Sequence, residues 1–176
     1  MAAVVDQVAV AAVGAADELL QLGVEPARPT VHLLSADVAQ PYLGHVVCRQ
    51  FSPGRDAAAA VQLLGLLPSV LAATHLVVVW EYVGLRNALE PGDGAGPSGL
   101  VVLEASLTSH VVRWYPFRRG AGGALWGEPA RYPDAVLPVP VEYLLRSWRR
   151  LVQDDVAATV ETLERAGYRV RWAARS

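Results

Sequence analysis

The sequence predicts a single α+β domain spanning residues 1–176, with a mixed, mostly antiparallel sheet of five to six strands flanked by helices. One reason is the order of its segments, α-β-β-α-β-β-β-α-β, in which strand pairs outnumber single crossovers. The other is composition. Of the 176 residues, 53% are hydrophobic and only 18% are charged, which is typical of one domain with a large core.

The chain begins with a predicted helix and a predicted hairpin. Apolar residues at helical spacing cover residues 3–22, and Gly23 suits the C-terminal end of this helix. Two β-rich segments follow at 31–36 and 42–51. Only a short turn at 39–41 separates them, so they should pair as an antiparallel hairpin.

A second helix and a central strand are predicted next. The helix runs from about residue 56 to 73, with Ser52 or Asp56 as its N-cap. Pro68 should kink this helix or end it early, because proline removes a backbone N–H donor. The segment 75–82 is apolar on both faces, as expected for a strand in the centre of a sheet.

The clearest hairpin joins predicted strands at 100–105 and 110–117, after a Gly/Pro-rich loop at 91–99. The stretch 118–136 shows no clear periodicity and is expected to be irregular. Irregular stretches of this length inside a domain are often functional.

The chain ends with a predicted long helix and a last strand. The helix covers about 141–166 and carries an apolar stripe of leucine, valine and tryptophan. Gly167 suits its C-terminal end. In 168–172 apolar residues alternate with arginine, so one face of this strand should be exposed to water.

Some functions are excluded by missing residue types. The chain contains no lysine and no isoleucine, and its one asparagine is Asn87. A P-loop needs a lysine on the phosphates and a Schiff-base enzyme needs a lysine amine. No Gly-x-Ser-x-Gly nucleophile elbow is present either. Since lysine, isoleucine and asparagine use AT-rich codons, we attribute their scarcity to a GC-rich genome.

The single cysteine, Cys48, lies in an apolar run and is expected to be a buried core thiol. One cysteine permits neither an internal disulfide nor a cysteine-rich zinc site, and the histidines show no metal-binding spacing. The first residues lack the basic region of a signal peptide, and polar residues interrupt the apolar stretch 57–80. We therefore expect a cytoplasmic protein without a membrane span, a metal or a cofactor.

Charge is unevenly distributed along the chain. Residues 1–99 hold four arginines against nine acidic residues, a net charge of −5, and residues 100–176 hold eleven against eight, a net charge of +3. Such a chain can neutralise its two halves internally or associate through complementary patches.

Glu81, Glu104 and His110, on three predicted central strands, form the candidate catalytic site. Two carboxylates and a histidine could hold a divalent metal or transfer protons. Asp37, at the end of an early strand, is a possible further ligand. A shared ion requires the two glutamate carboxylates to lie within about 8 Å of each other.

The register of the hairpin after residue 99 decides whether this site forms. In one register Glu104 opposes Val111 and makes an ordinary cross-strand ion pair with Arg113. In the neighbouring register Glu104 opposes Val112 and shares a face with His110. The sequence leaves both registers open.

Arginine and aromatic residues in the second half form a candidate interaction surface. Its members are Arg118, Arg119, Trp126, Tyr132, Arg146 and Arg149, with Trp148 either beside them or in the core. Protein interfaces are rich in these residue types, and single-stranded nucleic-acid sites use them as well. A solvated helix face is the third interpretation. The net charge of −2 and the pI near 6.1 argue against nucleic acid.

Three functions remain from the sequence. The first is a protein-interaction or homodimeric binding domain without catalysis, because no catalytic signature is present. The second is a metal-assisted, nuclease-like hydrolase of phosphoesters, in which Glu81 and Glu104 hold the metal, His110 transfers protons, and Arg113 or Arg118 binds phosphate. The third is an RNA or single-stranded DNA binding module that uses the arginine-rich second half.

Overall fold

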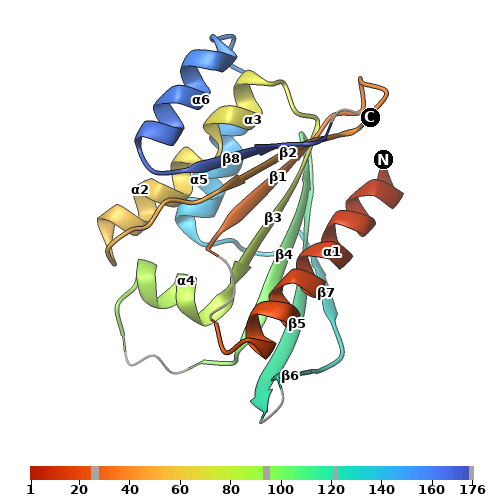
Figure 1. The fold of residues 1–176 in the computed structure, drawn as a ribbon, viewed down its shortest axis with the longest axis vertical. Helices are drawn as coiled ribbons and strands as arrows, with labels where there is room; N and C mark the ends of the chain where they lie inside the picture. The colour runs from red at the N-terminus through yellow and green to blue at the C-terminus, as the bar shows by residue number, and fades with distance from the viewer. Residues whose placement is uncertain (25–27, 93–95, 121–122, 175–176) are drawn as a thin grey trace.

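The computed structural model of the chain describes residues 1–24, 28–92, 96–120 and 123–174. In chain order the elements are α1 (Ala2–Gln21), β1 (Thr30–Leu34), β2 (Tyr42–Val47), α2 (Arg55–Leu63), α3 (Leu66–Val70), β3 (His75–Glu81), α4 (Tyr82–Leu89), β4 (Gly99–Ser106), β5 (His110–Gly120), β6 (Gly123–Trp126), β7 (Ala130–Pro133), α5 (Val139–Trp148), α6 (Val156–Arg165) and β8 (Arg169–Trp172). The predicted α+β class is confirmed (Figure 1).

The described strands form one eight-stranded sheet in the order β6-β5-β4-β3-β1-β2-β8, with β7 also paired to β5. Five to six strands were expected, so the sheet is larger than predicted. The expected predominance of antiparallel pairing is confirmed, and the ladders between the described strands are all antiparallel. The strand 75–82 lies near the middle of the sheet as β3, as its apolar sequence predicts.

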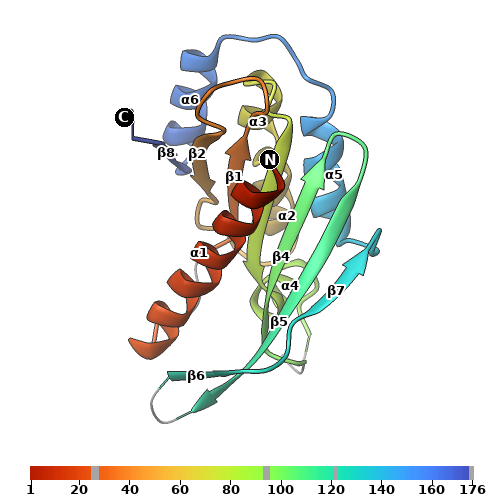
Figure 2. The same cartoon turned by 90° about the vertical axis from the view of Figure 1, so that its right-hand side faces the viewer.

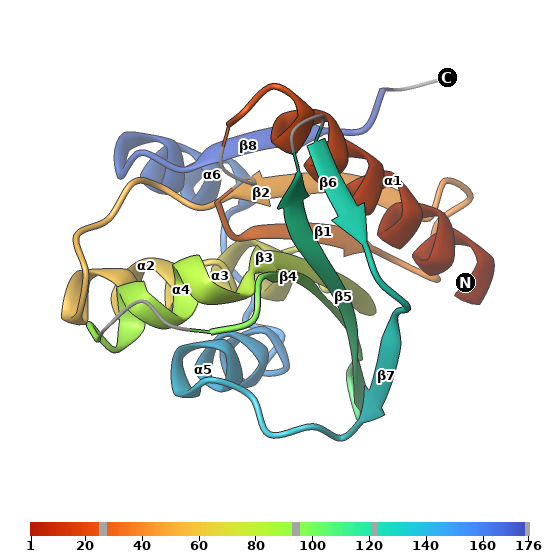
Figure 3. The same cartoon turned by 90° about the horizontal axis from the view of Figure 1, so that it is seen from below.

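Helices cover both faces of the sheet (Figures 1 and 3). The long helix α1 packs on one face, where Val5, Ala9 and Ala16 meet Val77 and Val102. On the other face α2, α3, α5 and α6 cover a larger core. Its largest fully buried side chains include Trp148, Leu64, Leu67, Leu76, Leu103 and Leu144. This division follows from the period of two in each strand, which sends alternate side chains to opposite faces.

The predicted helix 56–73 is two helices, α2 and α3, and the break lies at Gly65 rather than at Pro68. A Cβ at Gly65 would lie 3.1 Å from the carbonyl carbon of Leu144 and closer still to its oxygen, so α5 passes directly against this glycine. Pro68 is the third residue of α3, within the first turn, where a helix does not need the missing N–H.

The N-cap of α2 is Gly54, with φ +89°. The prediction of Ser52 or Asp56 as the N-cap was wrong. The Asp56 carboxylate instead accepts a hydrogen bond of 2.8 Å from the Ser52 N–H. It also forms an ion pair with Arg49, two residues after the end of β2. Asp56 therefore marks the start of the helix in the sequence, but its carboxylate does not cap the helix. It connects the helix start to the segment that follows β2.

The predicted helix 141–166 is also two helices, α5 and α6, separated by residues 149–155. Leu151 has φ +47°, a left-handed conformation that ends regular helix, and it is 38% exposed. Asp155 then caps α6 by accepting a hydrogen bond of 2.8 Å from the Ala158 N–H. The prediction that Leu151 belongs to the buried apolar stripe of one long helix was therefore wrong.

The prediction that the stretch 118–136 is irregular was wrong, because most of its described residues belong to β5, β6 and β7. Figure 2 shows the long strand β5 with β7 and β6 following one another along its outer edge. The central residues of the predicted loop at 91–99, residues 93–95, lie outside the described part of the chain. The short helix α4 was missed; it starts directly where β3 ends.

Within the described residues no helix is long and apolar enough to cross a membrane. Cys48 is fully buried, as predicted. Desolvation by burial raises its pKa to about 12, so the sulfur is a protonated core thiol at neutral pH.

Candidate functional site

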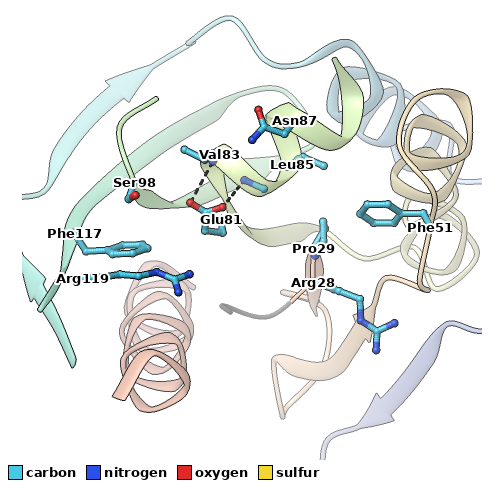
Figure 4. Close-up of a pocket in the computed structure, with 11 residues that line it drawn as sticks. Arg28, Pro29, Phe51, Glu81, Val83, Leu85, Asn87, Ser98, Phe117 and Arg119 are labelled. Atoms are coloured by element: carbon cyan, nitrogen blue, oxygen red, sulfur yellow. Dashed lines mark hydrogen bonds between the residues drawn. The ribbon is translucent and has the colours of Figure 1, made fainter. Parts of the chain in front are cut away.

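Glu81 serves as the N-cap of α4 (Figure 4). One carboxylate oxygen accepts a hydrogen bond of 3.2 Å from the Val83 N–H, and the other accepts one from the Gly84 N–H. These are two of the backbone donors that a helix start leaves without a partner. The carboxylate is therefore held against the helix by a structural role.

Glu104 opposes Val111, so the first of the two registers is the observed one. Its Oε1 lies 2.5 Å from Nε of Arg113, and Arg113 also contacts Asp6 of α1 at 2.5 Å. Desolvation lowers the pKa of Arg113, but the two carboxylates outweigh it, and the pKa lies above its usual value. Glu104 is thus one of three residues, with Arg113 and Asp6, in an ion-pair network that joins α1 to the sheet.

His110 lies on the opposite face from Glu104. It pairs with Ala105, and its Nε2 lies 2.9 Å from the carbonyl oxygen of Ala135. Because Ala105 belongs to the core under the helix layer, His110 faces α5 and not α1. The structure therefore does not bring the histidine to the glutamates.

The two glutamates are also far apart. Glu81 pairs with Leu100, four residues from Glu104 along β4, which corresponds to about 13 Å along the strand. Asp37 lies in the turn after β1, near the opposite end of β3 from Glu81. No group of three potential metal ligands occurs among the residues described. The placement of these side chains gives no support to a shared metal ion.

The predicted arginine–aromatic set is divided between two ends of the molecule. Arg118, Arg119 and Trp126 lie on the β5–β6 hairpin. The indole N–H of Trp126 donates a hydrogen bond of 2.8 Å to Asp17 of α1, and its ring lies 5.3 Å from that of Phe117. This group fastens α1 to the hairpin.

The second group surrounds α5. Trp148 belongs to the core, since it is fully buried and its indole donates to the carbonyl of Ala73 at 2.8 Å. Arg149 closes the β4–β5 turn by donating to the carbonyls of Ser106 and Ser109 at 3.1 and 3.2 Å. Desolvation lowers the pKa of Arg149. Tyr132 and Arg146 are exposed, as are Arg118 and Arg119 on the hairpin.

One side of α5 carries a continuous exposed stripe. Its members within the helix are spaced i, i+3, i+4 and i+7, so they share one helix face; they are Val139, Glu142, Tyr143 and Arg146. Arg150 follows two residues after the end of α5 and lines the same groove as Tyr143 and Arg146. We call this stripe, together with the adjacent Leu63 of α2, the α5 surface. Val139 is 60% exposed, Tyr143 46% and Leu63 43%. The Arg146 guanidinium lies 5.0 Å from the centre of the Tyr143 ring, a cation–π contact.

Grooves flank the stripe on both sides. Between α2 and α5 runs one of about 550 Å³, lined by Ala59, Leu63, Tyr143 and Arg146 among others. Between α5 and the start of β5 lies another of about 420 Å³, which includes His110 and Glu142. The stripe is therefore a ridge between two grooves, a shape suited to packing against another helix.

Exposed apolar side chains are frequent in the part of the sequence that contains α5. Fourteen described large hydrophobic residues are exposed, and six of them lie between Tyr132 and Val152. A seventh, Leu63, lines the α2–α5 groove together with Tyr143. Val136 is 96% exposed. Concentrations of exposed apolar side chains of this kind mark interaction sites on soluble proteins.

Sequence patterns do not reveal a polar cluster formed by His32, Tyr42 and His45 on the α1 face of the sheet. The Tyr42 hydroxyl lies 3.1 Å from Nδ1 of His32 and 3.0 Å from Nδ1 of His45. A hydroxyl has one proton, so it donates to one ring and accepts from the other. Burial lowers the pKa of His32 to about 4, and burial also lowers that of His45. Both rings are therefore neutral at pH 7, as a structural network requires.

Comparison with protein-family models, curated proteins and solved structures yields no match to this chain. Any function must therefore be inferred from the residues and the surfaces described above.

Proposed function

We propose that the protein acts as a homodimeric binding domain and that two copies associate through their α5 surfaces. The observation that supports this most directly is the exposed stripe of α5, with apolar, acidic, aromatic and basic residues in helical register. Tyrosine and arginine are among the residues that contribute most binding energy at protein interfaces.

Charge favours a second copy as the partner. Residues 131–155 hold four arginines and four acidic residues, so this region does not repel itself. Along α5 the acidic Glu142 comes first and the basic Arg146 follows, with Arg150 two residues beyond the end of the helix. Two antiparallel α5 helices would bring Glu142 of each copy to the arginines of the other, and their helix dipoles would also be complementary.

Shape supports the same arrangement. The ridge formed by Tyr143 and Arg146 borders the groove that contains Ala59 and Leu63. A two-fold axis across α5 would let the ridge of each copy pack into this groove of the other. Tyr143 would then lie near the centre of the interface, where water is excluded and substitutions have the largest effect.

Sedimentation velocity over a range of concentrations tests this proposal. Val139→Asp should shift the protein toward monomer, because it places a charge in the apolar contact. Since Val139 is the first residue of α5, an aspartate there suits the helix dipole and leaves folding intact. Val10→Asp is the matched control, because Val10 is 69% exposed on α1, away from the α5 surface.

A charge swap tests the antiparallel arrangement. Arg146→Glu and Glu142→Arg should each weaken association by about 5- to 30-fold, from two equivalent charge pairs per dimer. The double variant should regain most of the affinity. A double variant as weak as the sum of the two single changes would contradict this arrangement.

A further inference from the structure

The strand β8 ends the sheet on one side, and no strand lies beside its outer edge in the described part of the chain (Figure 3). On its inner side the Ala173 N–H donates a hydrogen bond of 3.0 Å to the Leu43 carbonyl of β2. Because successive residues of a strand direct their backbone groups to opposite sides, the N–H and C=O groups of Val170 and Trp172 point away from β2. An edge of this kind can pair with another extended chain.

One face of this edge carries arginine. Arg171 opposes His45 of β2, and Arg169 lies two residues before it on the same face. His45 opposes His32, and His32 opposes Val77, which packs under α1, so both arginines project from the α1 face. Both are exposed, and neither forms an ion pair with a carboxylate within the residues described. The Arg171 side chain reaches the outward carbonyl of its neighbour on β8 at 3.4 Å, a weak contact that a partner strand could replace.

The other face of the edge is apolar. Val170 is buried in the larger core, whereas Trp172 on the same face is 52% exposed. Opposite residues of two paired strands share a face, so a complementary strand would alternate acidic residues with apolar ones. A second copy of β8 does not fit this description, because it would bring arginine against arginine, and like charges directly opposite each other are destabilising.

We propose that the outer edge of β8 binds an extended segment of another protein in which acidic and apolar residues alternate, and that this segment pairs antiparallel with β8 as an added strand. Its carboxylates bind Arg169 and Arg171, and its apolar side chains pack beside Trp172. Its backbone forms hydrogen bonds with the outward groups of Val170 and Trp172. The site does not involve the α5 surface.

The test is fluorescence anisotropy with the labelled peptide Glu-Val-Glu-Val-Glu, for which we expect saturable binding below about 1 mM. The peptide Glu-Glu-Glu-Val-Val has the same composition and charge but cannot place its acidic residues on one face, so it should bind at least roughly five-fold more weakly. No saturable binding of the alternating peptide would overturn the proposal and would leave the arginines with the role of keeping sheet edges apart.

N-methylated peptides test the strand pairing itself. In antiparallel pairing the two valine N–H groups face β8, so their methylation should weaken binding at least roughly ten-fold. Methylation of the glutamate N–H groups, which face water, should have little effect. Binding that survives methylation of the valines would contradict an added strand.

Charge reversal in the protein gives the matched control. Arg171→Glu places a like charge beside the peptide and should weaken binding at least roughly five-fold. Arg118→Glu makes the same change on β5, at the other side of the sheet, and should leave binding unchanged. Equal losses in the two variants, or equally strong competition by a single-stranded oligonucleotide, would mean general attraction of polyanions and would contradict the site. Val139→Asp should bind the peptide as the wild type does, which separates this site from dimerisation.

Discussion

Gly65 gives the sharpest test of how the helix layer is packed. It has helical backbone angles, φ −77° and ψ −8°, so alanine would fit the conformation itself. The obstacle is α5. An added Cβ would lie 3.1 Å from the Leu144 carbonyl carbon, 3.3 Å from its Cα and closer still to its oxygen. Either α5 or the α2–α3 junction must move to accept one methyl group.

The size of the effect follows from two opposing contributions. Overpacking of a well-filled core costs about 1–3 kcal/mol. Alanine regains roughly 0.5–1 kcal/mol over glycine in a helical conformation. We therefore expect Gly65→Ala to lower the free energy of unfolding by about 1–2 kcal/mol, which for a chain of this length lowers Tm by roughly 2–8 °C.

Gly14 of α1 is the matched control. It is exposed within a helix, and an added Cβ there meets nothing within 4 Å. Gly14→Ala should raise the unfolding free energy by about 0.5–1 kcal/mol. Urea unfolding and thermal melts of both variants provide the measurement. If Gly65→Ala is as stable as the wild type or more so, α5 does not lie against this glycine and the packing argument fails.

Two further predictions concern two helix N-caps and a partly buried histidine. Glu81→Ala and Asp155→Ala each remove a helix N-cap and should lower the unfolding free energy by about 0.5–2 kcal/mol in urea titrations; unchanged stability in both would refute the caps. His32 has a folded pKa of about 4 against 6.5 for the free side chain, so the unfolded chain binds more protons between these values. The neutral His32 side chain therefore contributes up to about 3 kcal/mol to the free energy of unfolding above pH 6.5, and this contribution is lost as pH falls toward 4. His32→Gln should flatten this part of the profile of unfolding free energy against pH.

Local patterns were sufficient for the elements whose shape depends on their own residues. The helix over 3–22, the two hairpins and the last strand all follow from periodicity and turn residues. The register of the β4–β5 hairpin was one of two that the sequence allowed. The structure has the one in which the Ser106 N–H donates to the Ser109 carbonyl at 2.9 Å, which sets Glu104 opposite Val111.

The predictions that failed concern segments whose local structure depends on contacts with residues far away in the sequence. Gly65 breaks a helix because α5 approaches it, and no pattern around residue 65 contains that information. β6 and β7 have only four residues each, too few for a periodic pattern, and they pair along β5, which is unusually long at 11 residues. The break at 149–155 left a signal, Asp155, whose side chain caps α6. The apolar residues continue at helical spacing across the break, and this pattern favoured one long helix over the N-cap signal of Asp155.

The candidate sites also divide into features that local sequence patterns reveal and features that depend on contacts between distant segments. Arg146 could be placed on the polar side of a helix from spacing alone, and it lies there. The stripe that includes Val139 could not be recognised, because the predicted helix began two residues too late. Phe51, in the segment after β2, and Phe117, on β5, are far apart in the sequence but line one cavity, so only the tertiary fold brings them together.

The most direct test of the proposed self-association is sedimentation velocity of the wild type beside Tyr143→Ala. An exposed tyrosine at the centre of an interface should contribute about 2 kcal/mol or more, so the substitution should weaken dimerisation at least roughly 30-fold. Its removal from an exposed position should leave the unfolding free energy nearly unchanged. We expect a dimer for the wild type and a shift to monomer for Tyr143→Ala at equal concentration. A monomeric wild type at high concentration, or equal dimer affinities for the two proteins, would contradict association through α5.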